Sequence, residues 1–285
     1  MQGWSVSKAE FPNTHAALKG WRLASPDVNR DPMPWQALLL LVYALLQYVG
    51  PLAHVYKRAA LVLPWQFDGY MRPSEVLAIT KDDVFFTQHK DRRIAVIIQA
   101  APDDAEGSAA DVVRAARGRD RPTPAKTGEF DGTITLCDQA SERAGRALLA
   151  RTALVKLHAS CGRASGVSPG NVGKTMPPSH ASLAGITLAQ YEAALRFATK
   201  QVGLTSLKLT PHCARHGGAS HDSQGEFRTL AEIQQRGRWE AAKSVARYKK
   251  SGTLERQLKK FSPAQLRLAS SLQHSLPGTL SAVAL

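Results

Sequence analysis

Cysteine is scarce in this chain, and the few cysteines present form no framework. Cys137, Cys161 and Cys213 are far apart, odd in number and without CxxC spacing. This excludes a small disulfide-stapled secreted domain, and an intracellular, reduced protein is expected. The first 30 residues are polar and interrupted by prolines, so we expect no signal peptide.

Long apolar runs are also missing. The longest, 37–49, is interrupted by Gln47 and lies close to Pro34 and Pro51. A membrane-spanning helix needs roughly 20 apolar residues, so this run predicts a buried core helix. The sequence contains no GxxxxGK[ST] phosphate loop, no HExxH and no carboxylate cluster, so we expect neither ATP nor a metal or other cofactor.

Acidic residues are outnumbered by basic ones. Lys and Arg number 37 against 23 Asp and Glu, giving a formal net charge of +14. With 44% hydrophobic residues, the chain has enough apolar material for a core, which excludes a disordered polycation. The charge predicts a polyanionic partner, which can be DNA, RNA or an anionic membrane surface.

The order of local patterns predicts helices, then a small sheet, then helices again. Helical segments are expected at 34–50, 53–67 and 73–79, and short β-rich runs at 83–86, 92–99 and 133–136. The segment 100–122 between the second and third runs is interpreted as an insertion with a short helix at 109–116. Further helices are expected at 139–159, 187–202, 212–223, 229–236, 241–249 and 254–261, and Ser262-Pro263 resembles the start of another.

Two separated segments carry the chemical signal. The first is Arg72-Pro73-Ser74-Glu75-Val76-Leu77, just before the predicted sheet. The second is His212-Cys213-Ala214-Arg215-His216, followed by Trp239 and, nine residues later, Tyr248. Between them, within the sheet region, stands Lys126-Thr127-Gly128.

In this order and spacing the motifs resemble the tyrosine recombinase/integrase family over about residues 35–261. The resemblance implies an α+β, mainly α catalytic domain with a small antiparallel sheet. It also implies DNA cleavage and rejoining through a 3′-phosphotyrosine intermediate at Tyr248, without metal or ATP. On this basis residues 1–33 are an arm or the remnant of a core-binding domain, 34–261 the catalytic domain and 262–285 a C-terminal tail.

The resemblance also assigns roles. Arginine suits the clamping of non-bridging phosphate oxygens because guanidinium offers paired donors. Tyrosine is a weak nucleophile at its free pKa near 10, and neighbouring guanidinium groups favour its phenolate. A lysine can protonate the leaving 5′ oxygen, a histidine can take part in proton transfer, and an indole N–H can reach the phosphate. The implied catalytic set is Arg72, Lys126, His212, Arg215, Trp239 and Tyr248, supported by Glu75 and His216.

The basic residues of the second half are candidates for DNA contact. Between residues 192 and 260 there are 14 Lys and Arg and 6 Asp and Glu. This excess favours a surface that contacts phosphates. The alternative is a solvent-exposed face without a ligand. The residues expected to bind DNA are Arg238, Lys243, Lys249 and Lys250. The expected partner is double-stranded DNA, with a homo-oligomer on DNA formed through a C-terminal helix whose apolar face is Leu254, Leu258 and Phe261.

Several alternatives stay open at the level of sequence. Arg121 and Lys174 compete with Lys126 for its role, and His216 is equally compatible with the site or with the core. The short segment before residue 34 is compatible with a truncated fragment or a minimal enzyme. Alternative functions are a type IB topoisomerase-like relaxation and a catalytically silent DNA-binding integrase relative from a mobile element. The expected location is the cytoplasm and nucleoid in a bacterium, or the nucleus in a eukaryote.

Overall fold

The computed structural model describes residues 31–89, 92–97, 134–136, 141–161, 182–239, 245 and 251–285. These residues belong to a unit that runs from Asp31 to Leu285. The described residues exclude all but the last three residues of the predicted arm at 1–33. They exclude the whole predicted insertion at 100–122 and, apart from Val245, the predicted helix at 241–249.

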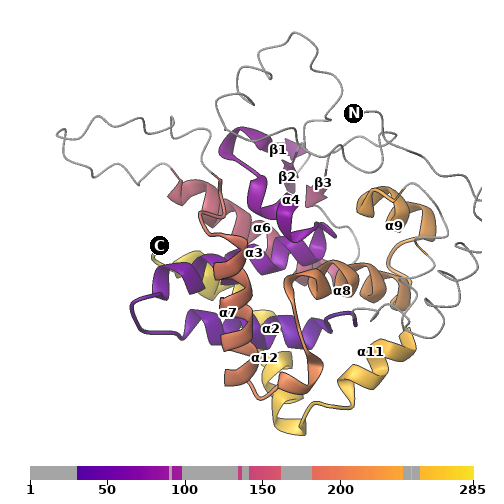
Figure 1. Ribbon diagram of the computed structural model, residues 1–285. Helices are drawn as coiled ribbons and strands as arrows, with labels where there is room; N and C mark the ends of the chain where they lie inside the picture. Colours follow the sequence, from indigo (N-terminus) through magenta and orange to yellow (C-terminus); the bar gives the residue numbers. More distant parts are fainter. Residues whose placement is uncertain are drawn as a thin grey trace, which may run out of the picture. The chain divides into compact units, whose positions relative to one another are not determined.

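The described elements follow the predicted order, and the prediction of a mainly α-helical domain is confirmed (Figure 1). The helices before the sheet are α2 (Trp35–Leu46), α3 (Ala53–Asp68) and α4 (Pro73–Ala78), followed by the 3-10 turn Lys81–Asp83. The helices after it are α6 (Ser141–Ser160), α7 (Leu188–Gln201), α8 (Pro211–Gln224), α9 (Leu230–Gly237), α11 (Ser251–Leu258) and α12 (Pro263–Ala282), with a 3-10 turn at Thr205–Leu207.

The core is organised around α3, which packs against α2, α6, α7 and α8. Every residue of α3 from Ala59 to Asp68 is buried, including the polar Gln66 and Asp68. A helix that is apolar on nearly all faces must be covered on all sides, which explains its central place. The buried polar residues at its C-terminal end require partners within the protein, and these partners form part of the site described below.

Three short strands form an antiparallel sheet in the order β1-β2-β3. They are β1 (Val84–His89), β2 (Arg92–Ile97) and β3 (Ile134–Leu136), with Val84 opposite Ile97 and Ile97 opposite Ile134. The inward side chains of Val84, Ile134 and Leu136 are buried in the main core. The sheet therefore packs on the helices and shares their hydrophobic core.

The C-terminal helices pack against the rest of the domain. The helix start predicted at Ser262-Pro263 is confirmed, because Ser262 is the N-cap of the 20-residue α12 and Pro263 is its first residue. Leu272, Leu276 and Leu280 of this helix are buried, and α12 packs against α2 and α6. The apolar face assigned to a neighbouring subunit is also used within the chain. Leu254 and Phe261 are buried, and Leu258 packs on the main core. These side chains therefore stabilise their own fold, because the amphipathic α11 lies against α8.

Two adjacent glycines allow α8 to approach α3 closely. A Cβ atom at Gly218 would lie 2.0 Å from the Phe67 carbonyl oxygen, and one at Gly217 would lie 2.2 Å from the Met33 carbonyl oxygen. Both neighbours are backbone atoms and cannot move aside as a flexible side chain can. Even one methyl group is therefore too large at these positions.

We expect Gly218→Ala to lower the free energy of unfolding by about 3 kcal/mol, the upper range of overpacking costs. Gly278→Ala is the matched control, because nothing lies within 4 Å of its Cβ position on α12. There alanine should stabilise by roughly 0.5–1 kcal/mol through helix propensity. Urea unfolding measures both variants, and equal stability of the two would contradict the close packing.

Among the helices in the described ranges, none combines the length and the apolar character that a bilayer span requires.

Candidate functional site

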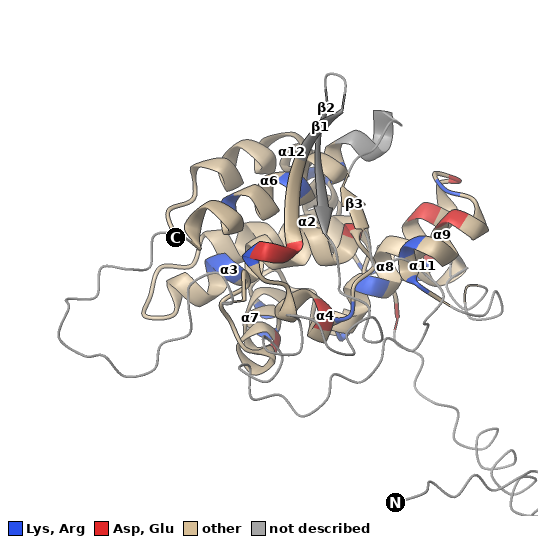
Figure 2. Cartoon of the chain, turned by 90° about the horizontal axis from the view of Figure 1, so that it is seen from above, with Lys and Arg blue, Asp and Glu red and all other residues tan. Residues whose placement is uncertain are grey.

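Three arginines from distant parts of the sequence converge on the carboxylate of Glu75. Arg72 contacts Glu75 Oε1 at 3.2 Å, Arg215 contacts Oε2 at 3.4 Å, and Arg238 contacts Oε2 at 2.6 Å. Figure 2 shows the acidic position on α4 beside basic segments of the neighbouring α8 region. We call Arg72, Glu75, Arg215 and Arg238 the arginine cluster.

The Arg-Pro-Ser-Glu motif positions its own end of this cluster. Arg72 is the N-cap of α4, Pro73 occupies the first helical position, and Glu75 the third. The Glu75 carboxylate accepts a hydrogen bond from the Arg72 backbone N–H at 2.6 Å, as in a capping box. Proline at the first turn has no N–H to leave unsatisfied, so the local sequence dictates both the helix start and the place of Glu75.

Arg215 lies in the middle of α8 and is 4% exposed. Its guanidinium donates to the Gly237 carbonyl oxygen at 2.7 Å and lies 5.0 Å from the centre of the Trp239 ring. The Trp239 ring also stacks on Tyr70, with ring centroids 6.2 Å apart and an interplanar angle of 18°. Trp239 thus contacts both Tyr70 and Arg215, and a cation–π contact helps to fix the arginine.

Arg238 occupies an unusual backbone position at the end of α9. Its φ of 53° and ψ of 50° are left-handed. The Arg238 N–H donates to the Gln235 carbonyl, and the Trp239 N–H to the Gln234 carbonyl. This pattern is a Schellman motif, in which glycine is the usual left-handed residue. The motif turns the chain sharply and places Arg238 and Trp239 side by side at the cluster.

The arginine cluster carries three positive charges and one negative charge. Burial lowers the pKa of Arg238, an effect that Glu75 opposes and Arg72 reinforces. Arginine nevertheless remains protonated at any physiological pH. The cluster therefore has a net positive charge of two, which suits an anion whose negative charge increases in a transition state.

The two histidines of the second motif lie on the same helix as Arg215. His212 is in the first turn of α8, three residues before Arg215 and four before His216. Residues three and four apart share a helix face, and both histidines are half-buried. Their spacing places His212 one turn from Arg215, as the motif predicts.

Five of the predicted residues lie outside the described part of the chain. They are the predicted nucleophile, the predicted general acid and three of the four predicted DNA-binding residues: Tyr248, Lys126, Lys243, Lys249 and Lys250. Their roles stay predictions. The fourth DNA-binding candidate, Arg238, is 8% exposed and pairs with Glu75, so it belongs to the arginine cluster.

Sequence reasoning missed a buried ionic network beside the cluster. Arg146 donates to Asp68 Oδ1 at 2.9 Å and to both carboxylate oxygens of Asp222 at 2.6 and 2.9 Å. Arg236 donates to Asp68 Oδ2 at 2.6 Å and to the Thr135 carbonyl at 2.9 Å. These contacts join the end of α3, α6, α8, α9 and β3.

Tyr70 connects this network to Trp239. Its hydroxyl donates to Asp222, and Arg228 contacts both Asp222 and the Tyr70 oxygen. Burial and the Asp222 charge raise the pKa of Tyr70, so its phenol stays protonated and acts as the donor. The Tyr70 ring also stacks on Trp239, so the hydrogen bonds that hold Tyr70 help to fix the position of the tryptophan. We call Asp68, Tyr70, Arg146, Asp222, Arg228 and Arg236 the buried network.

The buried network predicts a specific acid sensitivity. Burial alone would raise the pKa of Asp68 and Asp222, but nearby arginines, Arg236 and Arg146 foremost, hold both below their ordinary values. A lowered folded pKa gives stability that is fully present above the unfolded value near 4 and is lost as the pH falls through the folded value. We expect the free energy of unfolding to decline below about pH 4.

Urea unfolding between pH 7 and pH 3 measures this dependence. Asp222→Asn should be less stable at pH 7 and should lose less stability on acidification, because one of the two carboxylates no longer titrates. Parallel pH curves for the two proteins would show that Asp222 does not contribute to the acid sensitivity.

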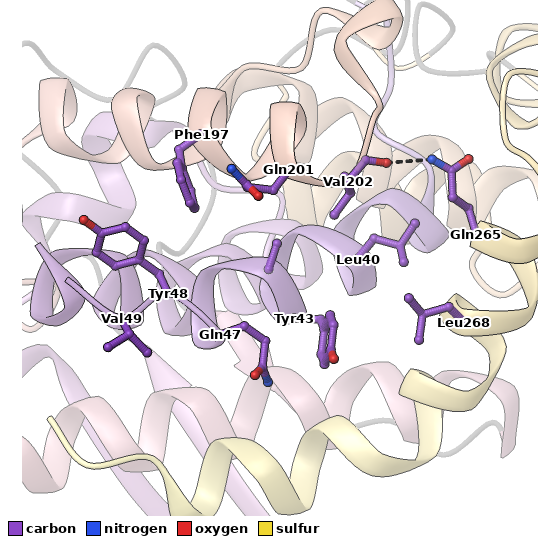
Figure 3. Close-up of a pocket in the computed structure, with 11 residues that line it drawn as sticks. Leu40, Tyr43, Gln47, Tyr48, Val49, Phe197, Gln201, Val202, Gln265 and Leu268 are labelled. Carbon is purple, nitrogen blue, oxygen red and sulfur yellow. Dashed lines mark hydrogen bonds between the residues drawn. The ribbon is translucent and has the colours of Figure 1, made fainter.

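An apolar groove of about 440 Å³ is lined by none of the residues of the arginine cluster. Figure 3 shows it between α2, α7 and α12, with Tyr43, Tyr48 and Phe197 among its lining side chains. None of the residues predicted from the motifs lines it. The groove therefore has no part in the site.

Comparisons with known proteins gave structural neighbours only. No family model and no curated protein matches the chain. The chain is similar to the XerH site-specific recombinase bound to difH substrate in a pre-cleavage complex, with 16% identity and a TM-score of 0.47 over 94% of this chain and 66% of that one. It is also similar to XerH bound to palindromic difH substrate in a post-cleavage complex, with 16% identity and a TM-score of 0.46 over 85% of this chain and 53% of that one. The chain thus spans between about half and two thirds of the length of these proteins.

Proposed function

We propose that this chain contains the catalytic domain of a tyrosine recombinase that cleaves and rejoins double-stranded DNA. The observation that supports this most strongly is the convergence of Arg72 and Arg215 on one carboxylate. Arg215 and Glu75 are 140 residues apart in the chain, yet their side chains are in contact. If the two motifs were only surface residues with no shared function, contact between their charged side chains would not be expected.

In the proposed reaction the two arginines bind the non-bridging oxygens of the scissile phosphodiester. The Tyr248 phenolate attacks phosphorus, a 3′-phosphotyrosine bond forms, and the bond from phosphorus to the 5′ oxygen breaks. Lys126 gives a proton to the departing 5′ oxygen, and His212 assists proton transfer. One phosphoester replaces another, so the 5′ hydroxyl of the same or a second strand can reverse the step without an energy source.

The surroundings of Trp239 support a positioning role for it. Trp239 is 7% exposed, and its ring contacts both the Tyr70 ring and the Arg215 guanidinium. The indole N–H is the only polar donor of this side chain, and in the proposed site it reaches the phosphate. The ring face orients the Arg215 guanidinium, and Gly237 is needed beside it because a Cβ there would lie 2.2 Å from the ring.

DNA is the proposed partner because the site and the net charge favour the same ligand. Phosphate contacts from Lys243, Lys249 and Lys250 would bring the duplex to the arginine cluster without selecting sequence. Binding should therefore weaken steeply with added salt.

The proposal is tested by incubating the protein with supercoiled plasmid at low salt and quenching with SDS. The expected products are covalent protein–DNA adducts and relaxed circles, both absent with Tyr248→Phe. Relaxation without strand exchange between two cognate sites would indicate a type IB topoisomerase-like enzyme. Salt-sensitive binding with no adduct, even on nicked suicide substrates, would contradict the enzymatic proposal and leave a silent DNA-binding relative.

A further inference from the structure

Arg238 stands where the backbone favours glycine. It is the left-handed residue of the Schellman motif that ends α9. A side chain in this conformation costs roughly 1 kcal/mol or more relative to glycine. Arg238 is also 8% exposed, so its charge is withdrawn from water. Both costs indicate that the Arg238 side chain makes an interaction within the protein that offsets them.

The contacts at Glu75 identify that interaction as the ion pair between Arg238 and Glu75. Among the three guanidinium contacts, that of Arg238 is the shortest at 2.6 Å, while Arg72 is at 3.2 Å and Arg215 at 3.4 Å. Arg238 and Arg215 both contact the same oxygen, Oε2. Glu75 is thus bound most closely by the arginine that lies outside the predicted phosphate clamp.

We propose that Arg238 is a positioning residue that neutralises Glu75 and thereby keeps Arg72 and Arg215 able to bind an oxyanion. This inference rests on the proposed phosphodiester function of the same site. Without Arg238, the Glu75 carboxylate would draw the Arg215 guanidinium closer, because two opposite charges in a site of low dielectric attract strongly. The clamp would then be occupied by the protein's own carboxylate.

The alternative is that Arg238 contacts the anion itself. A double-mutant cycle separates the two, because removing a direct ligand reduces binding whether or not Glu75 is charged. A residue that acts through Glu75 matters only while Glu75 is charged. Glu75→Gln is suitable for the second variant, since glutamine also forms the capping box that begins α4.

The experiment measures the binding of inorganic sulfate by calorimetry to wild type, Arg238→Gly, Glu75→Gln and the double variant. Glycine relieves the left-handed backbone, so Arg238→Gly should fold, and its thermal melting is recorded beside the titration. Arg238→Lys tests rescue by a conserved charge and should retain most of the affinity. Lys208→Gly is the matched control, because Lys208 is an exposed cation that is also left-handed, with φ of 48°.

We expect Arg238→Gly to weaken sulfate binding about tenfold in the wild-type background, the range of a charge-assisted interaction. In the Glu75→Gln background the same change should have less than about a twofold effect. Equal losses in both backgrounds, no loss in the first, or no sulfate binding by wild type would each overturn the proposal. A positive cycle in a protein that forms no DNA adduct would retain the role of Arg238 and reject the enzymatic function.

Discussion

Arg215→Lys is expected to lower the rate of covalent adduct formation by about 10²–10³-fold, the usual effect of removing one preorganised donor from an oxyanion site. Arg215 contacts Glu75, the Gly237 carbonyl and the face of Trp239 at once. A planar guanidinium can maintain these contacts and still present paired donors, whereas an ammonium group cannot. Adduct formation on a suicide substrate, followed over time, measures the rate.

The control for this prediction is Arg196→Lys on α7, where the arginine is exposed. It should leave the rate unchanged. Thermal melting of Arg215→Lys establishes that the protein is folded under the assay conditions. An adduct rate within threefold of wild type in a folded Arg215→Lys protein would remove Arg215 from the proposed clamp.

Asp222→Ala is expected to lower the free energy of unfolding by about 3–5 kcal/mol, the cost of leaving a buried charge uncompensated. Asp222 is fully buried and accepts hydrogen bonds from Arg146, Arg228 and Tyr70. Removing the carboxylate leaves the Arg146 guanidinium, 3% exposed, with Asp68 as its remaining acidic partner. Thermal melting should show a Tm lower by about 10 °C.

Glu226→Asn is the comparison, since Glu226 is exposed four residues along the chain and asparagine tolerates its left-handed φ of 52°. Its Tm should change little. If Asp222→Ala and Glu226→Asn had the same Tm, the buried network would contribute nothing to stability.

Local sequence was sufficient to predict most helices and one half of the site. Arg72, Pro73 and Glu75 form a helix start whose geometry follows from capping rules alone. His212 and Arg215 share a helix face because their spacing is helical. The motifs could therefore place these residues on elements, although only the family resemblance indicated that the elements meet.

The contacts between elements could not be predicted from the same patterns. Asp68 and Arg236 are 168 residues apart, and no local rule connects a carboxylate at the end of one helix with an arginine on another. A charged residue within the apolar segment ending at Asp68 was the available signal, since a buried charge requires a partner. The role of Arg238 depended on a left-handed backbone that its sequence does not favour.

In the C-terminal region the sequence predicted the start of a helix but not its packing. Ser262-Pro263 indicated where a helix begins, and no local pattern specified which helices it would contact. Burial of Leu272, Leu276 and Leu280 depends on tertiary packing, in which α12 lies against α2 and α6. Helix existence was predictable here, and helix location was not.

The central claim is tested most directly by locating the bond between protein and DNA. The SDS-quenched adduct is digested with nuclease and with a protease that cuts after glutamate, and the peptides are analysed by tandem mass spectrometry. Cleavage after Glu240 and Glu255 gives a peptide in which Tyr248 is the only tyrosine. The account predicts a nucleotide attached through a 3′ phosphate to Tyr248. Attachment to another residue, or through a 5′ phosphate, would contradict it.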